Sequence, residues 1–127
     1  MRLQDAKLLM RSLGLPFNAV RYNCVNTHNK SETVKHFFLK ALVARYFFSM
    51  GESVFTEYPI GHGVFDVFNL DRMTCYEIET APSSTIYQEK RNLLQGFRDH
   101  IEIIILPTKD FSNNLDEAIQ QIKAKVN

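Results

Sequence analysis

The chain has 127 residues, of which 45% are hydrophobic and 23% are charged, and its formal net charge at pH 7 is +1. This length and composition predict one compact domain and exclude a disordered or low-complexity chain. No run approaches the roughly 20 apolar residues of a membrane span, no signal-peptide pattern is present, and two cysteines make no disulfide framework. We therefore expect an intracellular, cytoplasmic protein with reduced thiols and no membrane partner. The near-neutral charge neither supports nor excludes nucleic acid as a partner.

A short first helix is predicted at the start of the chain. Residues 4–13 are helix formers, and Gly14 followed by Pro16 has the usual order of a helix stop. The next stretch, residues 16–28, mixes aromatic, Asn and Cys residues without periodicity, so we expect an irregular segment or a short strand there.

A longer helix is predicted next. The sequence Asn-Lys-Ser-Glu from Asn29 to Glu32 has the form of a capping box, which predicts a helix that begins there and runs to about Met50. A cap is also the commonest role of a glutamate such as Glu32. Apolar residues occupy opposite faces of this helix, so it should be buried on two sides. Either the N-terminal segment or a second subunit would cover the second side, and the latter would make the protein a homodimer.

The remaining chain alternates strand and helix signals. Three β-rich runs, separated by a glycine turn and by a second turn-forming stretch, predict an antiparallel meander. A Ser-rich cap then begins a helix, which a buried strand and an amphipathic last helix follow. The predicted strands are 53–60, 64–70, 73–80 and 101–106, and the predicted helices are about 84–97 and 115–126. This order predicts a mixed α/β (α+β) fold.

Three carboxylates are predicted to converge on the sheet. Glu77 and Glu79 are two residues apart on one strand, so they should project from one face about 7 Å apart. Asp66 lies among hydrophobic residues on the preceding strand, with Val64 and Phe68 as its expected neighbours on that face, beside the two glutamates. Converging acids repel one another unless a cation neutralises them, and oxygen ligands suit Mg²⁺ or Mn²⁺. The pattern indicates a metal site, and the alternative is an ordinary solvated Glu-x-Glu strand face.

A lysine is predicted on the buried face of the helix that follows. Lys90 lies in the middle of an apolar stripe that includes Ile86 and Leu94. Its amine either snorkels to water or is delivered to the acidic end of the sheet, where it would orient water or stabilise charge on a phosphate. Three other side chains are candidates for substrate contact or for support of the ligands, although a surface position would explain each of them. They are Glu57, His62 and Arg91.

In their order and spacing these residues resemble the PD-(D/E)XK nuclease superfamily, which includes restriction endonucleases and archaeal Holliday-junction resolvases. A helix with an early acid, Glu32, precedes a strand with the motif acid, Asp66, and Glu77-Ile78-Glu79 follows at the E-x-[K/E] position. The resemblance covers about residues 29–106, with 1–28 as an N-terminal extension and 107–127 as a C-terminal helix. It implies a restriction-endonuclease-like core, in which a mixed four-stranded sheet has the order α-β-β-β-α-β.

The resemblance implies a metal-dependent endonuclease that acts on duplex or branched DNA. Asp66 and Glu77 would bind Mg²⁺ or Mn²⁺ directly, and Glu32 would bind the metal directly or through water. Glu79 occupies the place usually held by the catalytic lysine, and Lys90 would supply that cation from the next helix. The catalytic set would then be Asp66, Glu77, Glu79 and Lys90, and the reaction would be hydrolysis of a phosphodiester by a metal-activated water.

Two alternatives use the same residues differently. A catalytically degenerate protein of this fold would have lost turnover with its lysine and would act as a DNA-binding or structural module. A small α+β interaction protein would carry the acids on its surface, and it would leave the half-buried Asp66 and the stripe position of Lys90 unexplained.

Overall fold

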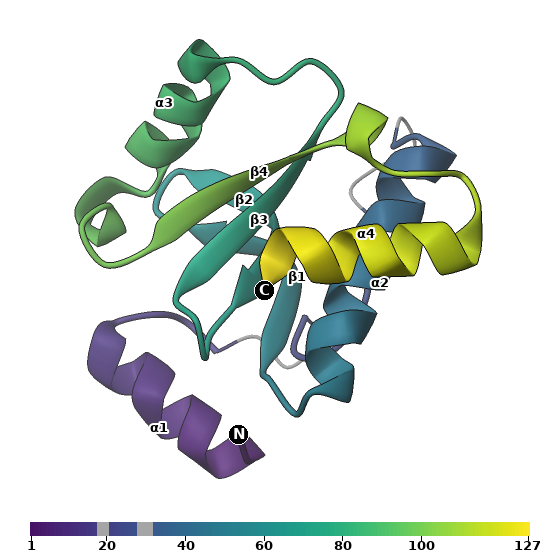
Figure 1. The fold of residues 1–127 in the computed structure, drawn as a ribbon. Helices are drawn as coiled ribbons and strands as arrows, with labels where there is room; N and C mark the ends of the chain where they lie inside the picture. Colours follow the sequence, from purple (N-terminus) through teal and green to yellow (C-terminus); the bar gives the residue numbers. More distant parts are fainter. Residues whose placement is uncertain (18–20, 28–31) are drawn as a thin grey trace.

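A computed structural model describes residues 1–17, 21–27 and 32–127. In these residues a four-stranded mixed sheet lies between two layers of helices, which confirms the predicted α/β class (Figure 1). The elements are α1 (Leu3–Leu13), α2 (Val34–Ser49), β1 (Val54–Ile60), β2 (Gly63–Asn69), β3 (Thr74–Glu79), α3 (Ser84–Leu93), β4 (Glu102–Pro107) and α4 (Leu115–Val126), with short 3-10 turns at Gln95–Phe97 and Thr108–Asp110. None of the helices in the described part of the chain has the length and apolarity to cross a membrane.

The sheet has the order β1-β2-β3-β4. Strands β1, β2 and β3 form the antiparallel meander that the sequence predicts, and β4 pairs with β3 in parallel through the α3 crossover. The register aligns Glu79 with Pro107, so the C-terminal ends of β3 and β4 lie at the same end of the sheet, next to the start of α3.

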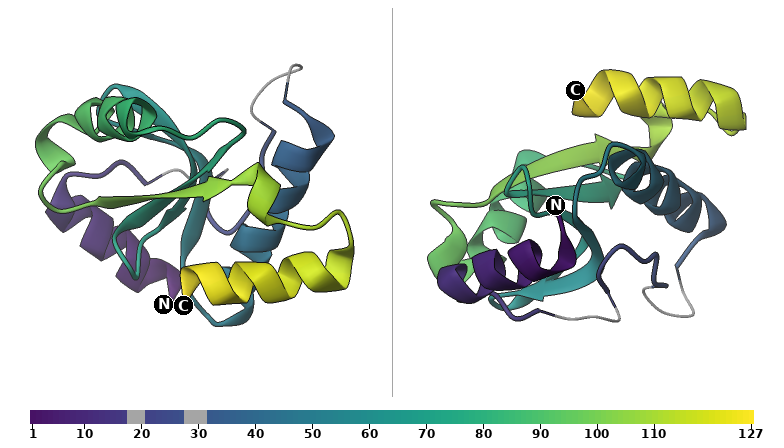
Figure 2. Two further views of the ribbon diagram at one scale, coloured as in Figure 1. Left: turned by 45° about the horizontal axis from the view of Figure 1, so that its top comes forward. Right: turned by 90° about the horizontal axis from the view of Figure 1, so that it is seen from below.

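Each face of the sheet packs on its own pair of helices. Figure 2 shows α1 and α4 on opposite sides of the sheet. One hydrophobic cluster joins α1 and the residues after α3 to the sheet, for example Met10, Phe68 and Leu94. The other cluster joins α2 and α4 to the opposite face, for example Val43 and Ile122. Each layer therefore positions side chains from a different helix against the same strands.

Helix α2 begins later than the capping-box pattern predicts. Its N-cap is Thr33, whose Oγ1 accepts a hydrogen bond from the His36 N–H at 3.1 Å. Glu32 therefore precedes the helix instead of lying in its first turn, which corrects the prediction, and Asn29 lies outside the described residues. A side-chain hydroxyl before the first turn satisfies an N–H that the helix cannot pair itself, so the threonine serves as the cap.

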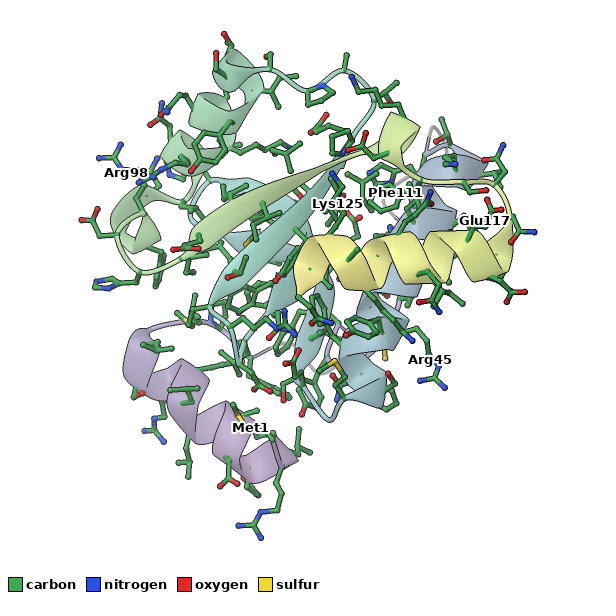
Figure 3. All side chains as sticks on the ribbon, in the orientation of Figure 1. Met1, Arg45, Arg98, Phe111, Glu117 and Lys125 are labelled. Carbon is green, nitrogen blue, oxygen red and sulfur yellow. The ribbon has the colours of Figure 1, made fainter. Side chains whose placement is uncertain are left out.

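The second side of α2 is covered by α4, which the sequence analysis did not assign to it. Phe47 of α2 shares a cluster with Ile122 and Val126, and Phe111, just before α4, belongs to the same cluster (Figure 3). Residues 23–25 also lie beside α2, around a hollow that Phe48 lines. Packing within one chain thus covers much of the apolar surface of α2, while Val34 and Phe48 remain exposed. The homodimer stays a prediction.

Helix α3 contacts the sheet mainly at its end. None of its residues is buried, whereas Leu94, its C-cap, is fully buried. The turn between β1 and β2 adds a backbone contact, in which the His62 N–H donates to the Leu93 carbonyl at 2.8 Å. The predicted helix over 84–97 is therefore a shorter α-helix followed by a 3-10 turn, and it is fixed at its C-terminal end.

Candidate active site at the end of the sheet

A hollow of about 450 Å³ opens where β3 ends and α3 begins. Its charged lining comes from four elements: His36 from α2, Asp66 from β2, Glu79 from β3 and Lys90 from α3. We call this hollow the β3–α3 pocket. It gathers three of the residues singled out in the sequence, and it adds a histidine that was not.

Strands β2 and β3 separate at the pocket, and two carboxylates bridge the gap. The last pair of the β2–β3 ladder is Val67 with Tyr76. Beyond it the Asp66 N–H donates to Glu77 Oε2 at 2.5 Å, and the Ile78 N–H donates to Asp66 Oδ2 at 2.8 Å. Side-chain oxygens thus replace backbone carbonyls as partners of these amides, which holds both acids in fixed positions.

A distorted residue lies on the neighbouring strand β1. Glu57, opposite Asp66 in the register, has φ +50, a left-handed conformation that is unfavourable for a residue with a Cβ. The regular alternation of faces breaks there, since Phe65 and Phe68 both pack in the α1 cluster and Val67 packs in the α2 cluster. Asp66 consequently reaches α2. The prediction that it shares a face with Val64 is confirmed, since both line the pocket, whereas Phe68 packs on the opposite face in the α1 cluster.

Asp66 forms an ion pair with His36. His36 Nε2 lies 3.2 Å from Asp66 Oδ2. Burial acts to raise the pKa of the Asp66 carboxyl, but the hydrogen bond and positive charge of His36 outweigh it, so the pKa is lowered. In turn the hydrogen bond to Asp66, opposed by burial and assisted by Glu32, raises the pKa of His36 to about 9. At neutral pH the pair is a carboxylate and an imidazolium.

Lys90 meets the acids from α3. Its Nζ lies 2.9 Å from Glu77 Oε1 and 3.7 Å from Glu79 Oε1, and its side chain is 27% exposed. Burial lowers the pKa of Lys90 while Glu77 raises it, and the net shift is upward. Burial and the charge of Asp66 raise the pKa of Glu77 to about 8, although Lys90 opposes them. The lysine on the apolar stripe therefore lies at the acidic end of the sheet.

A second set of charges is enclosed behind the pocket, between α2 and β1. The Nζ of Lys40, which is 0% exposed, lies 2.8 Å from Glu32 Oε2 and 2.9 Å from Glu57 Oε1. His36 Nδ1 lies 2.5 Å from the same Glu32 oxygen. Glu32 and Glu57 thus face buried cations on α2 and do not line the pocket.

The two remaining candidates lie elsewhere. His62 is exposed in the β1–β2 turn and does not line the β3–α3 pocket. Arg91 lines a different hollow together with Tyr87 and His100. These positions support no role for either residue in the pocket itself.

The predicted metal cluster of Asp66, Glu77 and Glu32 does not form as expected. Within the described ranges no group of three His, Cys, Asp or Glu side chains is arranged to hold a metal ion. The imidazole of His36 stands between Glu32 and Asp66, and the Lys90 amine binds Glu77. The donors nevertheless suit Mg²⁺, because proteins usually hold this ion with one or two carboxylates, waters and substrate phosphates. Asp66 and Glu79 both line the pocket.

Glu77 is the carboxyl at the pocket that most favours protonation, because burial and the charge of Asp66 raise its pKa to about 8. Either a divalent cation beside these acids or protonation of Glu77 reduces the repulsion between the neighbouring carboxylates.

Sequence reasoning missed His36 and Lys40. Both lie on the stripe of α2 that includes Val43 and Phe47, and Lys40 is fully buried. The signal was present, because a lysine in the middle of a buried stripe is the same pattern that marked Lys90.

Comparison of the chain with protein-family models, with curated proteins and with solved structures finds no match. The resemblance to PD-(D/E)XK nucleases therefore rests on the order and spacing of residues in the sequence.

Proposed function

We propose that the β3–α3 pocket is the active site of a metal-dependent endonuclease with a restriction-endonuclease-like core of the PD-(D/E)XK type. One observation carries the proposal. Asp66 and Glu77 bridge two separating strands at the pocket, and Lys90 reaches the same acids from the following helix. The hollow is open and is lined by Asp66, Glu79 and Lys90, while Glu77 lies buried beside it. A cation next to such carboxylates is suited to binding a phosphate and to hydrolysis by a metal-activated water.

The acids have the role of metal ligands in this proposal. Asp66, Glu77 and Glu79 are the carboxylates that would hold Mg²⁺ or Mn²⁺. Once bound, the ion would lower the pKa of a water molecule and stabilise negative charge on phosphate oxygens. His36 keeps the carboxylate of Asp66 ionised and oriented, since its imidazolium pairs with Oδ2 at 3.2 Å.

Lys90 has the role of the catalytic cation. With a side chain that is 27% exposed and lines the pocket, its amine can turn from Glu77 toward a phosphate oxygen of DNA. Stabilising the charge that develops on that oxygen is worth most in a partly desolvated site. The proposed substrate is the phosphodiester backbone of duplex or branched DNA.

Specific observations favour a second candidate, a catalytically degenerate protein of the same fold that binds DNA or serves as a structural module. Lys90 already satisfies Glu77, and the described residues include no three-ligand metal group. In such a protein the lysine would permanently take the place of a metal ion.

Cleavage assays separate the two. Supercoiled plasmid, a branched junction and single-stranded DNA would be incubated with Mg²⁺, Mn²⁺ or EDTA and the wild type, Asp66→Asn, Lys90→Met or Lys125→Met. Lys125 is the control, because it pairs with Asp110 and does not line the pocket. Metal-dependent cleavage that is lost only in the two pocket variants supports the nuclease. No cleavage, together with no effect of metal on the melting temperature, supports the degenerate protein.

A further inference from the structure

Lys40 is an unusual residue for the interior of a protein. Its side chain is 0% exposed, and lysines are almost never fully buried unless they are paired. Two carboxylates pair with it, Glu32 at 2.8 Å and Glu57 at 2.9 Å. A buried ion pair of this kind adds little stability compared with apolar residues of similar volume, because desolvation of the charges offsets their attraction. Stability alone is therefore a weak reason for its presence.

The contact with Glu57 coincides with the distorted backbone of β1. The left-handed φ of +50 at Glu57 interrupts the alternation of the strand and directs the side chain to α2, where Lys40 binds it. A residue with a Cβ keeps this conformation only when its surroundings hold it, and such distortions gather at functional sites. Asp66 lies opposite Glu57 in the register, so the distortion lies next to the pocket.

The contact with Glu32 leads to the pocket by a second route. Glu32 Oε2 binds Lys40 Nζ and His36 Nδ1 together, and the other ring nitrogen of His36 binds Asp66 Oδ2. The partner of one ring nitrogen fixes the orientation of an imidazole and so determines where the other nitrogen points. Contacts therefore run without a break from Glu57 through Lys40, Glu32 and His36 to Asp66.

We propose that Lys40 is a positioning residue for the β3–α3 pocket. By one route Lys40 fixes Glu32, Glu32 orients the His36 ring, and the ring orients the Asp66 carboxylate. By the other route Lys40 fixes Glu57, which keeps the backbone of β1 distorted opposite Asp66. Any effect on DNA cleavage rests on the proposed nuclease function. The effect on the geometry of His36 and Asp66 is independent of that function.

The test needs variants that fold. Lys40→Met alone leaves two buried carboxylates without their shared cation, which is strongly destabilising. The double variant Lys40→Met/Glu57→Gln removes one charge of each sign and leaves Glu32 paired with His36. Lys40→Arg is the conservative variant. The matched control is Lys125→Met/Asp110→Asn, which removes a lysine–carboxylate pair of 2.9 Å outside the pocket.

Two measurements are made on each variant whose circular dichroism spectrum matches that of the wild type. Long-range proton–nitrogen NMR spectra of the His36 ring report the hydrogen bonds to Glu32 and Asp66. Steady-state cleavage of the best DNA substrate gives kcat and KM separately. We expect the double variant to shift the His36 ring resonances and to lower kcat by about 10- to 100-fold with KM little changed. Lys40→Arg should show smaller changes in the His36 resonances and in kcat than the double variant. The control should change neither the resonances nor kcat.

Unchanged His36 resonances in a folded double variant would overturn the proposal, and so would a kcat equal to that of the control. Should the wild type cleave no DNA at all, the proposed nuclease function fails, but the NMR comparison still decides whether Lys40 positions His36.

Discussion

The two sides of the pocket hold similar charges in different ways. On the α2 side Lys40 is 0% exposed and Glu32 is 4% exposed, so these charged groups are almost completely removed from solvent. On the α3 side Lys90 is 27% exposed and Glu79 is 23% exposed, so their charged groups are open to the pocket. Enclosed charges cannot exchange partners without leaving a charge unpaired, whereas open ones can. The α2 side is thus suited to holding geometry and the α3 side to binding and chemistry.

Asp66 joins the two sides, so its replacement should have the largest effect. Asp66→Asn keeps an oxygen for the Ile78 N–H but loses the charge that pairs with His36 and the proposed metal ligand. We expect DNA cleavage to fall to the level of a protein-free control, measured by plasmid nicking with Mg²⁺ or Mn²⁺. Asp110→Asn is the matched control. Retention of more than half of the activity would contradict the role of Asp66.

Replacement of Lys90 tests the open side alone. Lys90→Met should lower kcat by about 100-fold, since it removes the cation proposed to stabilise the reacting phosphate. The same change should increase the effect of divalent cations on the melting temperature, because Glu77 and Glu79 lose their shared partner. Thermal melts with and without Mn²⁺ measure this effect. A smaller metal effect than in the wild type would show that Lys90 does not compete with a metal ion.

Raising the pH should destabilise the metal-free protein through both sides. The pKa of Glu77 rises from 4.5 to about 8 on folding, and that of His36 rises from 6.5 to about 9. Each group therefore adds stability that is complete below its unfolded pKa and is lost as the pH rises through its folded pKa. The melting temperature in EDTA should fall between about pH 6.5 and pH 9.

Variants and metal separate the two contributions to this pH dependence. Glu77→Gln should flatten the decline, because it removes the α3-side group and leaves His36 in place. Mn²⁺ at a hundred times its Kd should add about 2.7 kcal/mol to stability, and its affinity should rise with pH as Glu77 loses its proton. A wild-type melting temperature that increases steadily across this range would contradict the raised pKa values.

The smallest effect is expected for an ion pair that belongs to neither side. Lys125 lies 2.9 Å from Asp110, but its side chain is 47% exposed. Lys125→Met should change the free energy of unfolding by no more than about 0.5 kcal/mol, since exposed pairs contribute little. Urea denaturation measures it. If Lys125→Met lowered the free energy of unfolding more than Lys40→Met/Glu57→Gln does, the exposed pair would matter more for stability than the buried one, contrary to our expectation.

Local patterns predicted most of the fold. The meander follows from β-rich runs separated by turn residues, and the last helix has the predicted bounds of Leu115–Val126. Parallel pairing of β4 with β3 requires a crossover connection, and the sequence also predicted the helix that forms it. Lys90 was found because a lysine within an apolar stripe has few reasons to be there.

The α2 side could not be read from the same patterns. The left-handed backbone at Glu57 has no signal in the sequence, because glycine, not glutamate, is the residue expected there. Strict alternation then placed Phe68 on the same face as Asp66, whereas it packs on the opposite one. The capping-box pattern began α2 too early and gave Glu32 the role that belongs to Thr33. Pairing across 30 residues, as between His36 and Asp66, depends on tertiary packing that no local window contains.

The way α3 is attached has a consequence for how a long polymer reaches the pocket. The helix is fixed where Leu94 is buried and where the β1–β2 turn binds the Leu93 carbonyl, whereas Ser84 and Thr85 at its start are exposed and Ile86 and Tyr87 are only partly buried. Local opening has its lowest free energy where few apolar contacts are made. Amides near Ser84 should therefore exchange their hydrogens faster than those near Leu93. We expect such opening to displace the part of the pocket wall that carries Ile86 before the part that carries Lys90, which is nearer the fixed end and contacts Glu77.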